Sequence, residues 1–237
     1  MIKLALIGYG KMGRIIEQLA PEYGFEVALK LDIDNNANYQ GMTEANFAGV
    51  EVAIEFTTPA TAAENLVRLA GLGVNAVCGT TGWTANRARV REAVERHGTG
   101  MVWAPNFSIG VNVFLRLVEE AARLFADKTD YGAWGWEIHH DAKKDAPSGT
   151  MVQLVEAMRS SGYGRAIDVA SNRAGRLPGT HEIGFDSAAD TVTLRHQAHS
   201  REGFARGALF AAKWVVRRKG FHDFRDILFD GKSGGGS

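Results

Sequence analysis

The chain has 237 residues, 45% hydrophobic and 23% charged, and its 27 basic residues balance 27 acidic ones. That length allows one large domain or two smaller ones with their own cores, and zero net charge does not point to nucleic acid or an anionic membrane as a partner. The single cysteine, Cys78, excludes an intramolecular disulfide and no apolar run is long enough to span a membrane, so we expect a cytoplasmic protein.

The N-terminal half alternates apolar runs with amphipathic stretches. We expect strands at residues 2–7, 25–31, 50–56, 75–78 and 101–104, with helices at 11–19, 61–72 and 84–96. The opening MIKLALIGYG fits a first strand and is too short and too soon interrupted by glycine for a signal peptide. Strands and helices in turn predict βαβ units and a doubly wound parallel sheet of the Rossmann type.

The C-terminal half has a different pattern. We expect helices at residues 111–125, 151–160 and 204–218, and strands at 134–138, 165–172, 181–186 and 191–199. Consecutive strands without intervening helices favour a smaller α+β domain with a mixed sheet. The predicted domains are therefore 1–107, completed by a returning helix at about 204–230, and 108–203. The Gly/Ser-rich tail 231–237 is expected to be a flexible linker.

A glycine loop follows the first predicted strand directly. Gly8, Gly10 and Gly13 form a G-x-G-x-x-G pattern that opens a helix. In this context the first glycine permits a tight turn, the second lets the backbone approach a pyrophosphate, and the third allows close helix packing. The free N–H groups of the helix start would hold the phosphates. The loop predicts a dinucleotide site.

The end of the second predicted strand, KLDID, carries the residues expected to meet the adenosine ribose. Asp32 or Asp34 could accept hydrogen bonds from the ribose hydroxyls, which favours NAD, although a solvated loop position is the better interpretation of Asp34. Lys30 could tolerate a 2′-phosphate, so NADPH stays open.

Three further turns follow predicted strands: FTTP at 56–59, CGTTG at 78–82 and APNFS at 104–108. Ligands of open parallel sheets bind beyond the carboxyl ends of the strands, so we expect these turns to face the cofactor. Cys78 is expected to pack as a small hydrophobe, because no histidine lies near it in the sequence.

The segment EIHHDAKKDAPSGT, residues 137–150, gathers a proton donor, a cation and a helix start. His139 suits proton transfer near neutral pH, Lys143 can hold a carboxylate, and Ser148 is the expected N-cap of a helix whose first N–H groups can bind an anion. A solvated charged loop is the alternative. His139 and His140 would point to opposite faces of a strand, so no metal site is expected.

This segment closely resembles the signature of the dihydrodipicolinate reductase family, E-x-H-H-x-x-K-x-D-A-P-S-G-T. The stretches GYGKMGR, IEFTTP, VCGTTGW, APNFSIGVNVF and HQAHSREGFARGAL follow in the family's order, and the resemblance extends from Ile2 to about Leu228.

The resemblance implies a role for each matching residue. His139 matches the proton donor and Lys143 the second catalytic residue, while His140, Ser148, Gly149 and Thr150 match substrate-binding positions. The positions implied to bind cofactor are Gly8, Tyr9, Gly10, Lys11, Met12, Gly13, Asp32, Phe56, Thr57, Gly79, Thr80, Thr81, Ala104, Pro105, Asn106 and Phe107. The family uses NADH or NADPH; Asp32 without an adjacent arginine favours NADH.

The resemblance further implies reduction of 4-hydroxy-tetrahydrodipicolinate, a small dicarboxylate, to tetrahydrodipicolinate on the route to diaminopimelate and lysine. It also implies a homotetramer assembled through the sheet of the second domain. Two alternatives remain from the residues themselves: another nicotinamide-dependent dehydrogenase of the same architecture, and a non-catalytic NAD-binding regulator.

Overall fold

The computed structural model describes residues 1–229 and divides them into two compact units. The first unit joins Met1–Ser108 to the segment that begins at Glu202, and the second is Ile109–Arg201. The sequence prediction set the boundary one residue earlier, at Phe107. The tail predicted at 231–237 lies outside the described residues. None of the described helices is long and apolar enough to cross a membrane.

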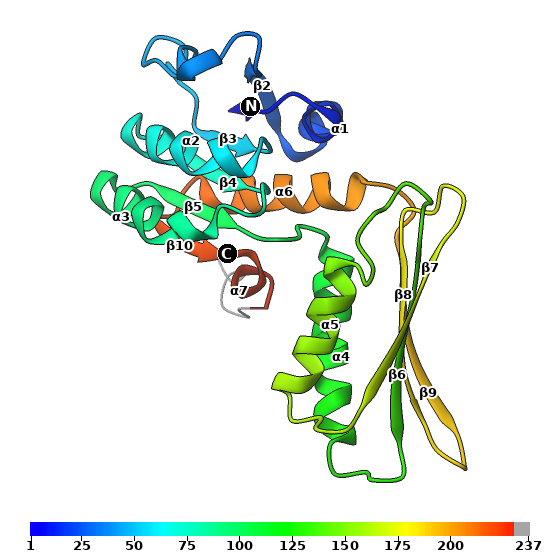
Figure 1. Cartoon of the computed structure of the whole chain (residues 1–237). Helices are drawn as coiled ribbons and strands as arrows, with labels where there is room; N and C mark the ends of the chain where they lie inside the picture. Colours follow the sequence, from blue (N-terminus) through cyan, green and yellow to red (C-terminus); the bar gives the residue numbers. More distant parts are fainter. Residues whose placement is uncertain (230–237) are drawn as a thin grey trace. The chain divides into compact units, whose positions relative to one another are not determined.

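The first unit is a six-stranded parallel sheet with the strand order β10-β5-β4-β3-β1-β2 (Figure 1). Its strands are β1 (Ile2–Ile7), β2 (Phe25–Leu31), β3 (Val52–Glu55), β4 (Asn75–Cys78), β5 (Gly100–Trp103) and β10 (Gly220–Asp223). Its helices are α1 (Lys11–Leu19), α2 (Pro59–Gly71), α3 (Arg87–His97), α6 (Glu202–Val215) and α7 (Phe224–Phe229), with 3-10 turns at Ala20–Tyr23, Ala37–Tyr39 and Thr84–Asn86.

Helices cover both faces of this sheet, as the alternating pattern predicted. Alternate residues of β1 supply the two cores: Leu4 and Leu6 pack with α1 and α6, whereas Ala5 and Ile7 pack with α2 and α3. Strand β3 is buried along its whole length. This division explains why the central strands are continuous apolar runs rather than alternating ones.

The second unit is a four-stranded mixed sheet with α4 (Ile109–Phe125) and α5 (Gly149–Ser160) against one face (Figure 1). Its strands, in the order β7-β6-β8-β9, are β6 (Gly132–His139), β7 (Ile167–Arg173), β8 (Thr180–Asp186) and β9 (Thr191–Gln197). Strands β6 and β7 are parallel, and the other neighbours are antiparallel. The predicted α+β arrangement with a mixed sheet is confirmed.

Several predicted boundaries were wrong by a few residues, and strand β10 and helix α7 were missed. The helix expected at 84–96 starts with a 3-10 turn and becomes α-helical only at Arg87. The helix expected to reach residue 218 ends at Val215, and the chain then forms β10 and α7. Strand β10 was missed because it is only four residues long and includes a histidine and an aspartate.

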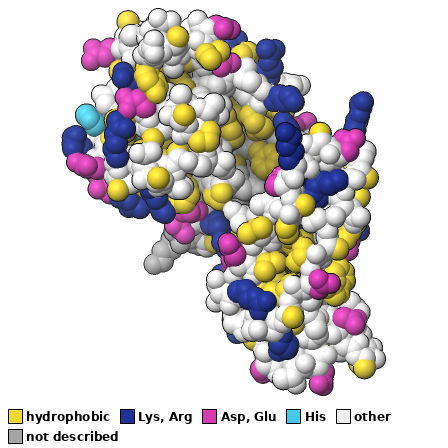
Figure 2. All heavy atoms as spheres, in the orientation of Figure 1, with side chains coloured by type: hydrophobic (Ala, Val, Ile, Leu, Met, Phe, Trp, Pro, Cys, Tyr) yellow, Lys and Arg dark blue, Asp and Glu magenta, His cyan; other side chains and the backbone are white. Residues whose placement is uncertain are grey.

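In Figure 2, basic and acidic side chains are interspersed over the visible surface.

Candidate active site and cofactor pocket

Three of the predicted turns converge at the carboxyl ends of the parallel strands. A Cβ atom added at Gly8 would lie 2.0 Å from the carbonyl oxygen of Phe56, and one added at Gly79 would lie 2.1 Å from the Phe56 ring. Gly8 also has a φ of +91°, a conformation that side chains other than glycine rarely adopt. These two glycines are therefore required for the turns after β1, β3 and β4 to approach one another.

A hollow of about 420 Å³ lies in the first unit where these turns meet. It is lined by Gly10, Lys11, Met12, Phe56, Thr57, Pro59, Gly79, Thr80 and Thr81. A Cβ added at Gly10 would have nothing within 4 Å, and Gly10 is the N-cap residue of α1. Open space in front of a helix N-terminus fits the phosphates of a dinucleotide. Pro59 also lines the hollow; the sequence analysis placed it in a turn that faces the cofactor but not among the individual contact residues.

Asp32 is tied to the glycine loop. Its Oδ2 accepts from the backbone N–H of Tyr9 at 3.2 Å, and its Oδ1 accepts from the N–H of Ile33 at 2.9 Å. Lys30 is 2.9 Å from the carboxylate of Glu17, which the Tyr9 hydroxyl also contacts. Asp34 is exposed, as expected for a solvated loop residue.

The turn at 104–108 contributes no lining residue to this hollow. Ala104 and Phe107 are buried in the core, where the Phe107 ring packs on Phe224 with 4.7 Å between ring centroids. Cys78 is also fully buried, and burial raises the pKa of its thiol well above the usual range, with the neighbouring Glu55 adding to the effect. Such a thiol is not a nucleophile at neutral pH.

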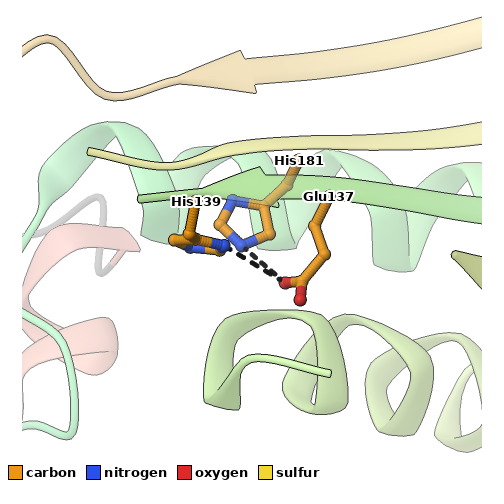
Figure 3. Close-up of side chains that lie close together, drawn as sticks. All are labelled: Glu137, His139 and His181. Atoms are coloured by element: carbon orange, nitrogen blue, oxygen red, sulfur yellow. Dashed lines mark ion pairs between the residues drawn. The ribbon is translucent and has the colours of Figure 1, made fainter. Parts of the chain in front are cut away.

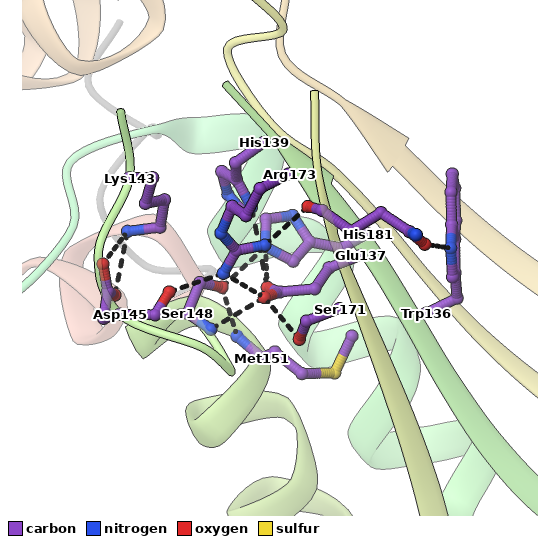
Figure 4. Close-up of polar contacts among 11 residues, drawn as sticks. Trp136, Glu137, His139, Lys143, Asp145, Ser148, Met151, Ser171, Arg173 and His181 are labelled. Atoms are coloured by element: carbon purple, nitrogen blue, oxygen red, sulfur yellow. Dashed lines mark hydrogen bonds and ion pairs between the residues drawn. The ribbon is translucent and has the colours of Figure 1, made fainter. Parts of the chain in front are cut away.

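In the second unit, strand β6 carries the two key side chains of the signature segment. Burial alternates along β6, so Glu137 and His139 share the face that lies against the helices. The strand register sets His181 of β8 and Ser171 of β7 opposite Glu137, and sets Arg173 of β7 opposite His139. Side chains from three strands thus meet at one buried point (Figure 4).

Glu137 is fully buried and hydrogen-bonded through one oxygen. Its Oε1 accepts from the backbone N–H of Ser148, the Ser171 hydroxyl and the Arg173 guanidinium, each at 2.9 Å. Burial opposes ionisation, but the Ser148 and Arg173 bonds outweigh it and lower the pKa of Glu137 to about 2. The carboxylate is therefore charged at neutral pH.

His139 lies beside this carboxylate with its Nδ1 3.7 Å from Oε2 of Glu137 (Figure 3). Burial lowers the pKa of His139, and the charge of Glu137 partly offsets the effect. The backbone of Gly179 borders the other ring nitrogen: a Cβ there would lie 2.8 Å from Nε2. Because its pKa is lowered, His139 is neutral at pH 7 in this structure.

The loop between β6 and α5 presents Lys143. Its Nζ is 2.7 and 2.8 Å from the two carboxylate oxygens of Asp145. The pKa of Asp145 is lowered first by Lys143 and to a smaller extent by the backbone N–H of Gly149. Ser148 caps α5, as predicted, because its hydroxyl accepts from the N–H of Met151 at 3.2 Å.

Two other predicted substrate-binding residues lie close in sequence to these groups. His140 follows β6, with its N–H bonded to the carbonyl of Leu177 at 2.8 Å, and Thr150 is in the first turn of α5. Both are half-buried. Lys143, Ser148 and Gly149 lie at the same end of α5, because Lys143 and the Gly149 N–H both contact Asp145 and Ser148 caps the helix.

Sequence reasoning missed Arg173 and His181 as members of this site, and it gave Glu137 no role although the residue begins the signature. His181 is buried, with Nε2 3.5 Å from Oε2 of Glu137 and 3.1 Å from the Ser148 hydroxyl. Its pKa is lowered to about 4, chiefly by burial. The sequence offered one signal for these residues, the alternation of polar side chains along the predicted strands of the C-terminal half. That alternation does not determine which residues of neighbouring strands lie opposite each other.

Glu137, His139 and His181 each offer a possible metal-ligating atom, all within 4.8 Å of one another. This set differs from the His139–His140 pair considered from the sequence. The guanidinium of Arg173 is 2.9 Å from Glu137 and already balances its charge, which disfavours a cation at the same carboxylate.

Family models match both units. The model described as "Dihydrodipicolinate reductase, N-terminus" matches residues 2–107, and "Dihydrodipicolinate reductase, C-terminus" matches residues 110–228. The chain belongs to the dihydrodipicolinate reductase family. It is accordingly an NAD(P)H-dependent oxidoreductase with a nicotinamide-binding first unit, and the family acts in lysine and diaminopimelate biosynthesis.

Relatives match over nearly the whole chain. A 4-hydroxy-tetrahydrodipicolinate reductase of Christiangramia forsetii is 34% identical and covers 97% of this chain and 98% of its own. One from Methanosarcina barkeri is 33% identical, with 96% and 99% covered. Among solved structures, a dipicolinate-bound dihydrodipicolinate reductase from Paenisporosarcina sp. TG-14 has the same fold, with a TM-score of 0.82, 24% identity, and 96% and 99% of the two chains covered.

Proposed function

We propose that the protein reduces 4-hydroxy-tetrahydrodipicolinate to tetrahydrodipicolinate, with His139 as the proton donor and Lys143 as the residue that holds a substrate carboxylate. The observation that carries the proposal is the carboxylate of Asp145. Lys143 contacts both of its oxygens and the backbone of Gly149 also stabilises its charge, in the same unit as His139. The site thus already has the chemistry to hold a carboxylate.

The proposed substrate suits these groups because it carries two carboxylates. One would replace Asp145 at Lys143 and the N-terminus of α5, where Ser148, Gly149 and Thr150 lie. His140 would contact the other end of the molecule. The relative of known structure that has dipicolinate bound supports a dicarboxylate as ligand.

The first unit would bind the cofactor at the hollow beside Gly10 and Thr80. Bound reduced nicotinamide supplies a hydride to the substrate. Asp32 would accept from the ribose hydroxyls of the adenosine, and its negative charge would repel a 2′-phosphate, so we propose a preference for NADH over NADPH. In this arrangement the predicted residues Tyr9, Lys11, Met12 and Thr81 would contact the phosphates through backbone and side-chain groups.

In the chemical step, the 4-hydroxyl group must leave as water, which gives a conjugated cyclic imine dicarboxylate. Hydride would add to this system, and His139 would protonate the atom on which negative charge then develops. Lys143 would make the bound substrate more electron-poor and stabilise that charge. The two roles suit two different groups, because a neutral imidazole offers a carboxylate an N–H but no positive charge, and an ammonium that is engaged by a carboxylate is a poor proton donor.

The experiment that tests this function follows NADH absorbance while the substrate is generated from pyruvate and aspartate semialdehyde by the preceding synthase. Oxidation that depends on the synthase supports the proposal. Absence of oxidation with NADH and with NADPH would reject it and favour a non-catalytic nucleotide-binding protein. Oxidation with a different carbonyl or imine substrate alone would favour another dehydrogenase of this architecture.

We also propose a cytoplasmic homotetramer assembled through the sheet of the second unit. Helices α4 and α5 cover one face of that sheet, and the residues on the other face of β6, including Trp134 and Trp136, are only half-buried. Burying that apolar surface between copies would be favourable. Light scattering on the purified protein tests the state of assembly, and a monomeric mass would reject it.

A further inference from the structure

The carboxylate of Glu137 is held in one orientation. Within the described part of the chain, three groups donate hydrogen bonds to it, and the N–H of Ser148, the hydroxyl of Ser171 and the guanidinium of Arg173 are all directed at Oε1 (Figure 4). They come from a loop and from a neighbouring strand, so the carboxylate cannot rotate without breaking bonds in both. The other oxygen, Oε2, therefore points in a fixed direction.

That direction is toward the histidines. Within residues 1–229, Oε2 of Glu137 and Nδ1 of His139 are both buried without a hydrogen-bond partner, and they face each other at 3.7 Å. A buried polar atom without a hydrogen-bond partner destabilises the fold. Two such atoms that face each other at slightly more than hydrogen-bond distance can form a hydrogen bond after a small movement. A small turn of the imidazole ring is sufficient. Hydrogen bonds in catalytic sites often tighten in this way when substrate binds.

His181 does not compete strongly for the same oxygen. Its Nε2 is 3.5 Å from Oε2 of Glu137 but only 3.1 Å from the hydroxyl of Ser148, which is the shorter contact. Ser148 is in turn fixed as the N-cap of α5. The structure thus gives His181 a partner and leaves Oε2 for His139.

We propose that Glu137 is a positioning residue for His139: its Oε2 accepts a hydrogen bond from Nδ1–H, which directs Nε2 to the substrate and stabilises the imidazolium that donates the proton. This inference rests on the proposed function. It adds a residue that touches neither substrate nor cofactor and acts only through the histidine.

The proton transfer balances with this arrangement. The Nε2–H bond of the imidazolium breaks and its electron pair stays on Nε2, while the proton forms a bond to the substrate atom that has become negative after hydride addition. The ring is left neutral with its remaining proton on Nδ1, still bonded to Glu137. Solvent then returns a proton to Nε2 for the next turnover.

The surrounding charges explain why a carboxylate is needed here. Burial and the cations Lys143 and Arg173 all lower the pKa of His139, whereas Glu137 and Asp145 raise it. His181, the other titratable neighbour, would add a further positive charge if it were protonated. A dicarboxylate substrate neutralises Lys143 and adds negative charge. Glu137 and the substrate together then favour the charged imidazole that the reaction requires.

The substitution Glu137→Gln tests the proposal. Three donors at Oε1 require the amide oxygen to take that place, so the amide NH₂ must stand where Oε2 was. An NH₂ group donates to Nδ1, which imposes the opposite tautomer and opposes the imidazolium. We expect kcat to fall about 100-fold, the usual contribution of a general acid, while NADH affinity stays unchanged. The matched control is Glu182→Gln, the same chemical change on the neighbouring strand, where Glu182 pairs with the exposed Arg195.

The tautomer is read directly from nitrogen NMR of histidine-labelled protein, with the His139 signals assigned by their loss in a His139→Gln variant. In the wild-type protein we expect Nδ1 protonated and Nε2 bare, and the reverse in Glu137→Gln. The dependence of kcat on pH gives a second readout. The pH at which kcat falls because the donor loses its proton should be lower in Glu137→Gln than in the wild-type protein. A mere structural role for Glu137 would lower the melting temperature but move neither signal.

Each outcome decides the proposal. A Glu137→Gln protein with wild-type kcat and pH profile would overturn it, as would a wild-type protein whose His139 carries its proton on Nε2. The wild-type NMR measurement holds even if the variant fails to fold. Failure of the proposed function is distinguishable, because then the wild-type protein itself does not oxidise NADH with the synthase product, whatever the tautomer of His139.

Discussion

The backbone N–H of Ser148 donates to Oε1 of Glu137 at 2.9 Å, so the carboxylate beside His139 also fixes the N-cap residue of α5. This bond joins the two ends of the signature segment across the loop that carries Lys143. The proposed proton donor and the proposed carboxylate site are therefore positioned by one buried charge, and changes at one are expected to reach the other.

The proposed roles predict that His139→Gln and Lys143→Ala both lower turnover without weakening cofactor binding. Loss of a general acid should reduce kcat by roughly 100- to 10,000-fold. Loss of a charged contact to the substrate should reduce kcat/KM about 10- to 100-fold. Steady-state kinetics and an NADH titration test this. Lys144→Ala, which removes the exposed neighbouring charge, is the control; an equal loss of NADH affinity in either variant would contradict this division of roles.

Gly179 is predicted to keep the Nε2 side of His139 accessible. A methyl group at this position would lie 2.8 Å from Nε2 and 2.9 Å from Cδ2 of the ring. We expect Gly179→Ala to displace the imidazole and lower kcat about tenfold or more, because small misplacements of catalytic groups are costly. Gly175→Ala is the control: this glycine also has a positive φ, but a Cβ there meets nothing within 4 Å. Equal activity of the two variants would show that backbone strain alone explains any loss.

The sequence predicted the first unit better than the second, for a physical reason. Strand β1, the glycine loop and α1 are adjacent in the chain, so local pattern and turn chemistry determine them together. The cluster around Glu137 depends instead on how β6 pairs with β7 and β8. A shift of that register by one residue would turn His181 and Arg173 to the opposite face of the sheet, and nothing in a single sequence specifies the register between distant strands.

The packing of the turn at residues 104–108 also depends on an element that is distant in the sequence. The turn's position after β5 was predicted from the chain, but Phe107 packs into the core against α7, an element that the sequence pattern did not reveal. The hollow lies at the ends of β1, β3 and β4, where the rule for open parallel sheets places a ligand, because that rule depends only on strand direction; cofactor binding there stays a prediction.

Asp32 is predicted to determine the choice of cofactor. Removal of its carboxylate should weaken NADH binding about 10- to 100-fold, the value of a charged hydrogen bond to the ribose, and should weaken NADPH binding much less. Asp32→Ala and the control Asp34→Ala differ in that only Asp32 is bonded to the glycine loop, through the N–H of Tyr9. Titration of both variants with both cofactors checks this. An unchanged ratio of the two affinities in Asp32→Ala would remove Asp32 from the cofactor site.

Substitutions at Gly8 and Gly10, two of the three glycines of the loop, are predicted to have different effects. Gly8→Ala combines a φ of +91° with a Cβ 2.0 Å from the Phe56 carbonyl, so it should lower the free energy of unfolding by about 1–3 kcal/mol or more. Gly10→Ala meets nothing within 4 Å and should fold normally, but its methyl group would occupy the space expected for the pyrophosphate and weaken NADH binding. Thermal unfolding with and without NADH separates the effects; normal NADH affinity in a folded Gly10→Ala protein would contradict the predicted phosphate position.

Acid is predicted to destabilise the fold through His181 and then Glu137. Below its ordinary pKa of 6.5, His181 takes up a proton in the unfolded chain but not in the folded protein until about pH 4. The unfolded state therefore binds more protons in this range, and the free energy of unfolding falls as pH decreases, by about 3 kcal/mol in total. Glu137, whose pKa is lowered from 4.5 to about 2, continues the loss in the same direction over that lower range.

Urea unfolding at a series of pH values measures this slope. His181→Asn should reduce the slope between pH 6.5 and about 4, because the variant no longer has an imidazole at position 181 that must be kept neutral on folding. It should also be less stable than wild type at pH 7, since the Ser148 hydroxyl loses its partner. The control His97→Asn removes a histidine from the last turn of α3 in the first unit. A His181→Asn slope as steep as that of the control would show that His181 is not the group that couples stability to acid.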